Sequence, residues 1–254
     1  MNRSLLLAAL LAASASFTAA CNVSVDSGGN EGGSGGAGGG AGSTDSDDCT
    51  GPKPQCLYDV PSYCKDYGNG PQWECAPTPL VLVFDRAPVT FTAATSDGFD
   101  LVGSGERVAS DWPTASTPWL ALDRDRNGAV DDATELFGSA VRLATGLRAT
   151  NGFEALAELD ENADGVIDAR DARFGELGIW ADGDADRVTD PGELSSASVG
   201  RRRLVSIELG FVVAPACDAR GNCGVERAGF TWADEAGALH RGEVVDVHLP
   251  VRAW

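Results

Sequence analysis

The chain has 254 residues, of which 43% are hydrophobic, and its formal net charge is −19 at pH 7. A chain of this length can bury one sizeable core or two small ones. The strong negative charge excludes nucleic acid as a partner, because binding to phosphates needs a basic surface. The acidic residues are also concentrated, because fifteen of the 38 lie in three short segments, 123–135, 160–171 and 182–193.

Residues 1–20 have the features of a signal peptide, with Arg3 ahead of a short apolar run and small residues ahead of a cysteine. The small residues before Cys21 resemble the box of bacterial lipoproteins, in which this cysteine carries the lipid. The resemblance implies lipidation of Cys21, contact with the membrane only through that anchor, and a location in the cell envelope, at the outer membrane or the cell surface. The alternative is an ordinary signal peptide that is cut near Ala20.

Residues 21–48 are rich in glycine and serine and almost free of apolar side chains, so we expect a disordered linker. Residues 49–78 contain four cysteines and are expected to form a small cap that depends on disulfides. A metal site is the alternative for these four, but their spacing lacks the paired C-x₂₋₄-C of zinc sites. Cys217 and Cys223 flank a Gly-Asn turn, which predicts a local disulfide between them.

The folded domain is expected at 79–254. Alternating and β-branched patterns predict strands at 79–85, 87–93, 203–213, 227–234 and 243–251, the last three as an antiparallel meander. Apolar residues three and four apart predict short helices at 133–141, 151–159 and 169–177. The predicted fold class is therefore α+β, with short EF-hand-like helix-loop-helix calcium motifs flanked by antiparallel β-strands.

Segment 160–171 has the clearest calcium-loop pattern, with oxygen-bearing side chains on alternate positions and Gly165 at position 6. Such side chains surround one ion only if the backbone curls, and a glycine permits the positive φ of that curl. The predicted Ca²⁺ ligands are the side chains of Asp160, Asn162, Asp164, Asp168 and Asp171 and the carbonyl of Val166.

Two further segments repeat the pattern, each with one defect. In 123–135 the closing acid comes one residue late, and the predicted ligands are Asp123, Asp125, Asn127, the Ala129 carbonyl, Asp131 and Glu135. In 182–193 an arginine, Arg187, stands at the glycine position, and the predicted ligands are Asp182, Asp184, Asp186, the Val188 carbonyl, Asp190 and Glu193. We rank the calcium affinities with 160–171 first, 123–135 second and 182–193 third. Acidic turns on a solvated surface are the alternative.

Residues 79–250 resemble the EF-hand-like calcium-binding region of bacterial RTX, haemolysin-type secreted proteins, through ELFG, NGFEALAELDENADGVID and WADGDADRVTDPGEL. A related region forms the self-processing module of iron-regulated RTX proteins. The resemblance implies calcium-dependent folding. In self-processing members it also implies cleavage of an Asp-Pro bond just before the first strand, through an acyl intermediate that can join a lysine amine. This chain has Thr78–Pro79 there, so the attacking aspartate is missing.

We therefore expect a calcium-binding, membrane-tethered lipoprotein that serves as a structural or binding module and is not an enzyme. The alternatives are a variant of the self-processing module and a dockerin-like attachment module, because segments 160–171 and 182–193 begin 22 residues apart. The only histidines, His240 and His248, have no nucleophile beside them in the sequence. A protein or glycan partner stays unidentified, and 110–119, with Trp112 and Trp119, is the stretch best suited to grip a sugar.

Overall fold

The computed structural model describes residues 52, 62–66, 71–85, 87–95 and 97–252. The predicted signal peptide at 1–20, the lipidation site Cys21, the linker at 21–48 and part of the predicted cap at 49–78 lie outside these residues. All described residues belong to one of the two compact units of the chain, Ser43–Trp254. Among them, no helix has both the length and the apolar character needed to cross a membrane.

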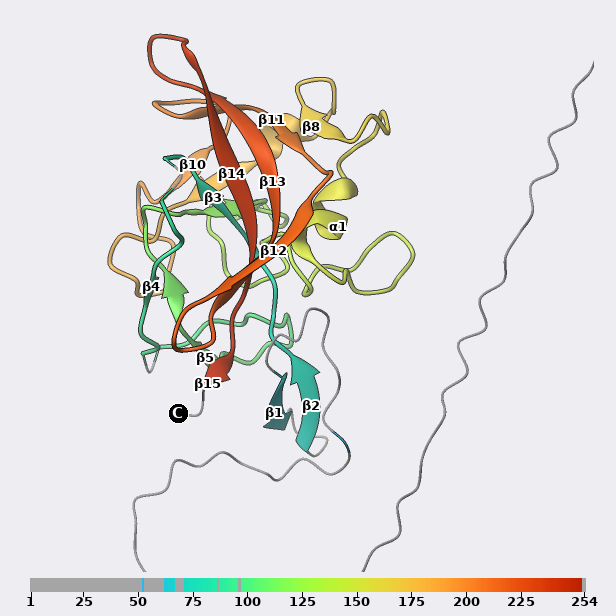
Figure 1. The fold of residues 1–254 in the computed structure, drawn as a ribbon, viewed down its shortest axis with the longest axis vertical. Coiled ribbons are helices and arrows are strands. Elements are labelled where there is room, and N and C mark those ends of the chain that lie inside the picture. Colours follow the sequence, from blue (N-terminus) through green and yellow to red (C-terminus); the bar gives the residue numbers. More distant parts are fainter. Residues whose placement is uncertain (1–51, 53–61, 67–70, 86, 96, 253–254) are drawn as a thin grey trace, which may run out of the picture. The chain divides into compact units, whose positions relative to one another are not determined.

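The largest element of the described fold is a curled antiparallel sheet (Figure 1). Its path runs β10-β9-β7-β3-β14-β13-β11-β8, and β12 pairs with β13 outside that path. These strands are β3 (Leu80–Val83), β7 (Trp119–Ala121), β8 (Val166–Asp168), β9 (Gly178–Trp180), β10 (Leu194–Ser196), β11 (Arg203–Glu208), β12 (Val212–Cys217), β13 (Cys223–Ala233) and β14 (Leu239–His248). Three small pairs are formed by β1 (Ser62–Asp66) with β2 (Pro71–Cys75), β4 (Phe91–Thr92) with β6 (Trp112–Pro113), and β5 (Ala109–Ser110) with β15 (Val251–Arg252).

The predicted α+β class with helix-loop-helix motifs is wrong. In the described part of the chain, α1 (Gly152–Ala157) is the one α-helix, and η2 (Phe174–Glu176) is a single 3₁₀ turn at the end of the helix expected over 169–177. Segments 123–135 and 182–193 lie between strands or extended chain rather than between helices. The EF-hand description therefore does not hold for the elements that flank the acidic segments.

The helix expected at 133–141 is replaced by an irregular segment that lies against the sheet. Leu80 N donates to Phe137 O at 3.0 Å, and Gly138 forms an isolated bridge with Pro79. Leu136 and Phe137 are both fully buried, but they belong to different cores. The apolar residues of this segment are three and four apart because they are buried on two opposite sides of it. They do not form one face of a helix.

The short helix α1 confirms the expectation for 151–159. Asn151 caps it, because its Oδ1 accepts a hydrogen bond from Glu154 N at 2.9 Å. The Glu154 carboxylate in turn accepts from Thr150 N at 2.7 Å, so two backbone amides at the helix start are satisfied. Phe153 and Leu156 place the apolar face of the helix in the core.

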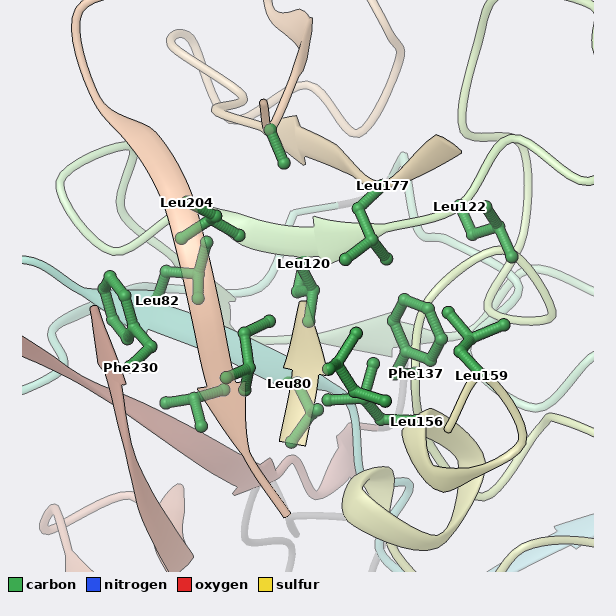
Figure 2. Packing of buried hydrophobic residues seen from close by; sticks show 14 of the residues in the cluster. Leu80, Leu82, Leu120, Leu122, Phe137, Leu156, Leu159, Leu177, Leu204 and Phe230 are labelled. Atoms are coloured by element: carbon green, nitrogen blue, oxygen red, sulfur yellow. The ribbon is translucent and has the colours of Figure 1, made fainter. Parts of the chain in front are cut away.

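The sheet has a hydrophobic core on each face, and β3 contributes to both. Leu80 and Leu82 point into the first core, whereas Val81 and Val83 point into the second. Figure 2 shows the first core, where Leu80 and Leu82 lie among side chains from the sheet, from α1 and from the 133–141 segment. This double burial explains why the strand reads as an uninterrupted apolar run.

The second core contains an aromatic cluster of Phe99, Trp112, Trp119 and Trp180. The ring centroids of Trp112 lie 4.9 Å from those of Trp119 and 5.6 Å from those of Trp180. Trp112 and Trp119 are at most 1% exposed. These two side chains are therefore core residues and form no surface on which a sugar could stack.

The predicted disulfide between Cys217 and Cys223 is confirmed. It joins the ends of the paired strands β12 and β13, with 4.0 Å between the Cα atoms. Cys75, from the predicted cap, is also disulfide-bonded.

Asp111 lies between β5 and β6, and its side chain connects three distant parts of the chain. Its side chain is buried, and Oδ1 accepts a hydrogen bond from Ala94 N at 2.8 Å. Oδ2 accepts from Asn222 Nδ2 at 2.7 Å and from Arg252 Nη2 at 2.9 Å. The charge of Asp111 is thus surrounded by donors, as a buried carboxylate requires.

Replacing Asp111 by alanine is expected to lower the free energy of unfolding by about 3 kcal/mol, because the buried Asn222 amide and the partly exposed Arg252 guanidinium each lose an acceptor. Urea unfolding at constant calcium measures the change. Asp85→Ala is the matched control, since the exposed Asp85 carboxylate accepts from the neighbouring Ala87 N, and its effect should stay within about 0.5 kcal/mol. Equal effects of the two substitutions would contradict the structural role of Asp111.

Candidate functional site

The three acidic segments share one hydrogen-bond frame, beginning with the aspartate at position 1. In each segment its carboxylate accepts from the backbone amide at position 6, and in the first two also from position 5. The bonds are Asn127 N and Gly128 N to Asp123 at 3.1 and 2.8 Å, Asp164 N and Gly165 N to Asp160 at 3.2 and 2.9 Å, and Arg187 N to Asp182 at 3.0 Å. The chain therefore curls around each aspartate as the pattern predicted.

The closing acid completes the same frame in all three segments. Each one accepts from the amides at positions 2 and 9, which are Arg124 and Asp131 for Glu135, Glu161 and Asp168 for Asp171, and Gly183 and Asp190 for Glu193. Glu135 makes these two bonds at 2.8 and 3.0 Å although it stands at position 13. Its late position is therefore absorbed without loss of the frame.

The backbone curvature is also shared. Positive φ occurs at positions 4 and 6 of every segment, at Arg126 and Gly128, Ala163 and Gly165, and Ala185 and Arg187. The sequence predicted the position-6 residues but gave no sign of position 4, where the residues are not glycine. A further bond runs from the position-7 amide to the position-5 side chain, from Ala129 to Asn127, Val166 to Asp164, and Val188 to Asp186.

Arg187 occupies the glycine position of the third segment with φ of 66°. Its side chain is 1% exposed and turns away into the second core, where the guanidinium lies 5.4 Å from the Trp112 ring centroid. Nη1 donates to Thr95 Oγ1 at 2.7 Å and Nη2 to Ser110 O at 3.2 Å. These buried contacts hold a backbone conformation that an arginine rarely adopts.

Asp182, at position 1 of the third segment, has an oxygen that suits a metal ligand. It is 3% exposed, and its Oδ1 is buried with the Trp112 side chain beside it but with no hydrogen bond of ordinary geometry among the described residues. Burial raises the pKa of this carboxyl and also that of Glu135. Raised pKa values mean that the surroundings disfavour the carboxylate anions, and a bound cation would reverse this.

The acidic side chains converge in two of the three segments. Oxygens within 4.8 Å of one another come from Asp123, Asp125 and Glu135, from Asp182, Asp184 and Glu193, and from Asp184, Asp186 and Asp190. Asn127 also contacts the first group, because its Nδ2 donates to Asp125 Oδ2 at 3.0 Å. The donor sets are rich in oxygen and fit a hard cation such as Ca²⁺.

Segment 160–171 differs, because Arg170 neutralises part of it. The guanidinium lies 2.5 Å from Asp164 Oδ2 and 2.7 Å from Asp168 Oδ2, and its hydrogen bonds lower the pKa of Asp168. Asp160 and Asp171 keep the bonds of the common frame, and Asn162 Oδ1 accepts from Asp164 N at 2.9 Å. A calcium ion in this segment would compete with the guanidinium, which weighs against the predicted first rank in affinity.

The first and third segments pair with each other through position 8. Val130 N donates to Thr189 Oγ1 at 2.9 Å, and that hydroxyl donates to Val130 O at 3.3 Å. Position 8 of the second segment, Ile167, instead pairs with Ile207 of β11. The dockerin-like alternative, which relied on the spacing of the second and third segments, receives no support from this arrangement.

The Thr78–Pro79 bond lies at the start of β3 and is held from two sides. On one side, Val247 N donates to Pro79 O at 3.0 Å and Leu249 N to Pro77 O at 3.1 Å. On the other side, Ser139 N donates to Thr78 Oγ1 at 3.2 Å. Gly138 packs so closely that an added Cβ would lie 1.9 Å from the Thr78 carbonyl oxygen. The bond is thus fixed in a buried, extended segment.

Comparison with known families gives a match to the SPM domain over residues 80–249. This chain belongs to the SPM domain family. The iron-regulated protein FrpA of Neisseria meningitidis serogroup C is 33% identical over 159 residues, which cover 61% of this chain and 14% of that protein. The chain therefore spans a small part of the length of this relative, and the expected relationship to iron-regulated proteins is confirmed.

The two histidines of this SPM domain differ in their surroundings. His240 is exposed, lies 3.0 Å from Asp234 Oδ2 and stacks on Trp232 with 4.4 Å between ring centroids. His248 is buried, and its Nε2 lies 2.9 Å from Glu226 Oε2. Sequence reasoning missed the partner acid, although Asp246 and His248, two residues apart among the valines of the final strand, were a signal of a buried polar pair.

Proposed function

We propose that this chain is a calcium-dependent variant of the SPM-type processing module in which Thr78 replaces the residue that would start self-processing. The observation that carries the proposal is the match to the SPM domain, which begins at residue 80, directly after the Thr78–Pro79 bond. The relationship to an iron-regulated protein supports the same reading. The wild-type chain would then be a non-cleaving member that keeps the calcium-dependent fold.

Calcium would bind in the three acidic segments. The shared hydrogen-bond frame, the converging oxygens and the buried Asp182 Oδ1 support this part of the proposal. Without a cation, the clustered carboxylates repel one another and favour the unfolded chain. A bound Ca²⁺ supplies the opposing charge, so calcium binding and folding are linked.

Residue 78 would decide whether the peptide bond between residues 78 and 79 breaks. An aspartate carboxylate can attack its own carbonyl carbon and close a five-membered anhydride, while the C–N bond to proline breaks and the proline nitrogen takes up a proton. The anhydride is then opened by water or by an amine. A threonine hydroxyl attacking the same carbon would have to close a strained four-membered ring, so Thr78 cannot start this reaction.

We also propose that the chain is exported and anchored by a lipid on Cys21, with residues 22–48 as a linker that holds the folded part away from the membrane. The support is the sequence alone, in which the box before Cys21 is followed directly by the glycine-rich stretch. Mass spectrometry of the N-terminal peptide from the membrane fraction tests this, since an unmodified peptide would contradict the anchor.

Thr78→Asp is expected to make the chain cleave itself when calcium is added. The chain should be cut between residues 78 and 79, because the new carboxylate lies beside the carbonyl of residue 78, in a segment that the sheet already holds in place. Gel electrophoresis and intact-mass measurement follow the reaction in calcium, in magnesium and in chelator. The wild-type chain should stay whole in all three.

Thr78→Asn is the matched control, because its side chain has the size of aspartate without the carboxylate. It should show far less cleavage than Thr78→Asp under the same conditions. Calcium-dependent folding of each variant is verified by circular dichroism, since Thr78 is buried. A folded Thr78→Asp chain that stays intact in calcium would refute the proposed relation to processing.

A further inference from the structure

Three ionisable side chains lie together inside the sheet, away from the acidic segments. Glu226 comes from β13, and Asp246 and His248 come from β14. Their exposed fractions are 1%, 0% and 3%. Charged residues are almost never buried to this degree unless they are paired or bind a metal.

The three side chains point at one another. His248 Nε2 lies 2.9 Å from Glu226 Oε2, and each residue offers one ligand atom within 4.8 Å of the other two. Asp246 Oδ2 accepts a hydrogen bond from Gly152 N, at the start of α1. The cluster is therefore held by two neighbouring strands and by the helix that covers this face of the sheet.

Two atoms of the cluster lack a partner among the described residues. These are Asp246 Oδ1 and His248 Nδ1, and both are buried. A buried polar atom without a hydrogen bond is rare, and each costs about 1 to 3 kcal/mol. The open carboxylate oxygen and the open ring nitrogen together suggest that the cluster is made for a bound ligand.

The charge of the cluster leads to the same conclusion. Two carboxylates face one imidazole, because Glu226 and His248 are the ionisable groups grouped with Asp246. Among the described residues, the Glu226 carboxylate pairs with His248 and the Asp246 carboxylate accepts from Gly152 N, so no lysine or arginine balances either one. A divalent cation would balance both carboxylates and could take the open Asp246 Oδ1 as a ligand.

We propose that Glu226, Asp246 and His248 bind one divalent transition-metal ion of the zinc type. One imidazole nitrogen with two carboxylate oxygens is a donor set that such ions accept, whereas calcium takes oxygen ligands. The site is enclosed, so the ion would enter during folding and join β13, β14 and the start of α1. It is separate from the calcium segments and does not depend on the proposed processing chemistry.

The register between β3 and β14 places the proposed site close to Thr78. Asp246 is paired with Leu80, and the next hydrogen-bonded pairs place His248 directly opposite Thr78 on the same face. The ion would therefore lie near the start of β3, close to Thr78. Binding should stiffen the junction between Thr78 and the end of β14.

The test measures zinc in the full exported chain, purified without chelator and kept in about 10 mM calcium so that the acidic segments are occupied. One zinc per chain is expected by elemental analysis, and Co²⁺ in its place should give visible absorption. His248→Gln should weaken zinc binding at least about 100-fold, because the nitrogen ligand is lost. His240→Gln is the matched control on the same strand, since His240 is exposed and outside the cluster, and it should bind zinc as the wild type does.

Asp246→Asn provides a second variant in case His248→Gln fails to fold. The amide oxygen can still accept from Gly152 N, while the negative charge is removed, so zinc binding should fall with the fold preserved. Equal zinc content and affinity in the wild type and in a folded cluster variant would overturn the proposal. So would a wild-type chain that binds no zinc in calcium, because the cluster would then share protons rather than a metal.

Discussion

Removing calcium with a chelator is expected to lower the midpoint of thermal unfolding by about 10 to 30 °C. Extracellular calcium sites bind at about 10⁻⁴ to 10⁻³ M, so about 10 mM calcium stabilises the folded state by about 1.4 to 2.7 kcal/mol per site. Three sites give about 4 to 8 kcal/mol, and one kcal/mol moves the midpoint of a domain of this size by about 2 to 4 °C. Differential scanning calorimetry with and without chelator measures the shift.

The size of this effect follows from the placement of the acids. Fifteen carboxylates lie in three short segments, and the first and third segments are joined through Val130 and Thr189. The repulsion between the ten acids of these two segments therefore acts within one region of the fold. The third segment also anchors Arg187 in the aromatic core, so loosening it should weaken the second core as well.

Magnesium is the first control for this prediction, because it demands tighter octahedral geometry and gives up its water reluctantly. It should recover little of the lost stability. Asp182→Asn removes one position-1 ligand and should reduce the calcium stoichiometry by one, whereas Asp234→Asn, outside the segments, should leave it unchanged. An unfolding midpoint that does not change with calcium would mean that the three segments are acidic surface turns that bind no calcium.

Gly138→Ala is expected to lower the free energy of unfolding by about 3 kcal/mol or more. The added Cβ would lie 1.9 Å from Thr78 O and 2.6 Å from the Thr78 carbonyl carbon. Both are backbone atoms of a chain that β14 fixes from the other side, so no side chain can rotate to make room. The segments must separate, and overpacking of this kind is costly. Urea unfolding in saturating calcium measures the loss.

Gly175→Ala is the control for this substitution, since a Cβ there meets nothing within 4 Å. Neither glycine has a positive φ, so the comparison isolates the steric effect from backbone strain. The control should change stability by less than about 0.5 kcal/mol. Similar stability of the two variants would mean that the 133–141 segment does not hold Thr78–Pro79 as tightly as the contacts indicate.

Part of the candidate site could be predicted because its determinants are local. The frame around Asp160 and Gly165 joins residues at most twelve positions apart, so their spacing in the sequence already encodes the curl of the chain. The same is true of Cys217 and Cys223, which a turn brings together. Glu135 closes the hydrogen-bond frame despite its late position, and its role as a calcium ligand stays a prediction.

Other features of the site depended on side chains that the local pattern does not constrain. Arg170 lies on Asp164 and Asp168, and Arg187 turns into the second core, where it lies over Trp112. Either arginine could have pointed to solvent without changing the spacing of the acids. The order of calcium affinity therefore depends on contacts that the spacing of the acids does not reveal, whereas the predicted ligand positions follow from that spacing alone.

By itself, the sequence determined the positions of the acidic loops, the local disulfide, α1 and the strands at the start and end of the folded domain. Only the tertiary structure decided that 133–141 is not a helix, that the first acidic loop pairs with the third, and that Glu226 meets Asp246 and His248. Hydrogen bonds between near neighbours leave a pattern in the chain, whereas the register of strands far apart in the sequence does not. Which buried side chains meet is fixed by that register, and so by the folded sheet as a whole.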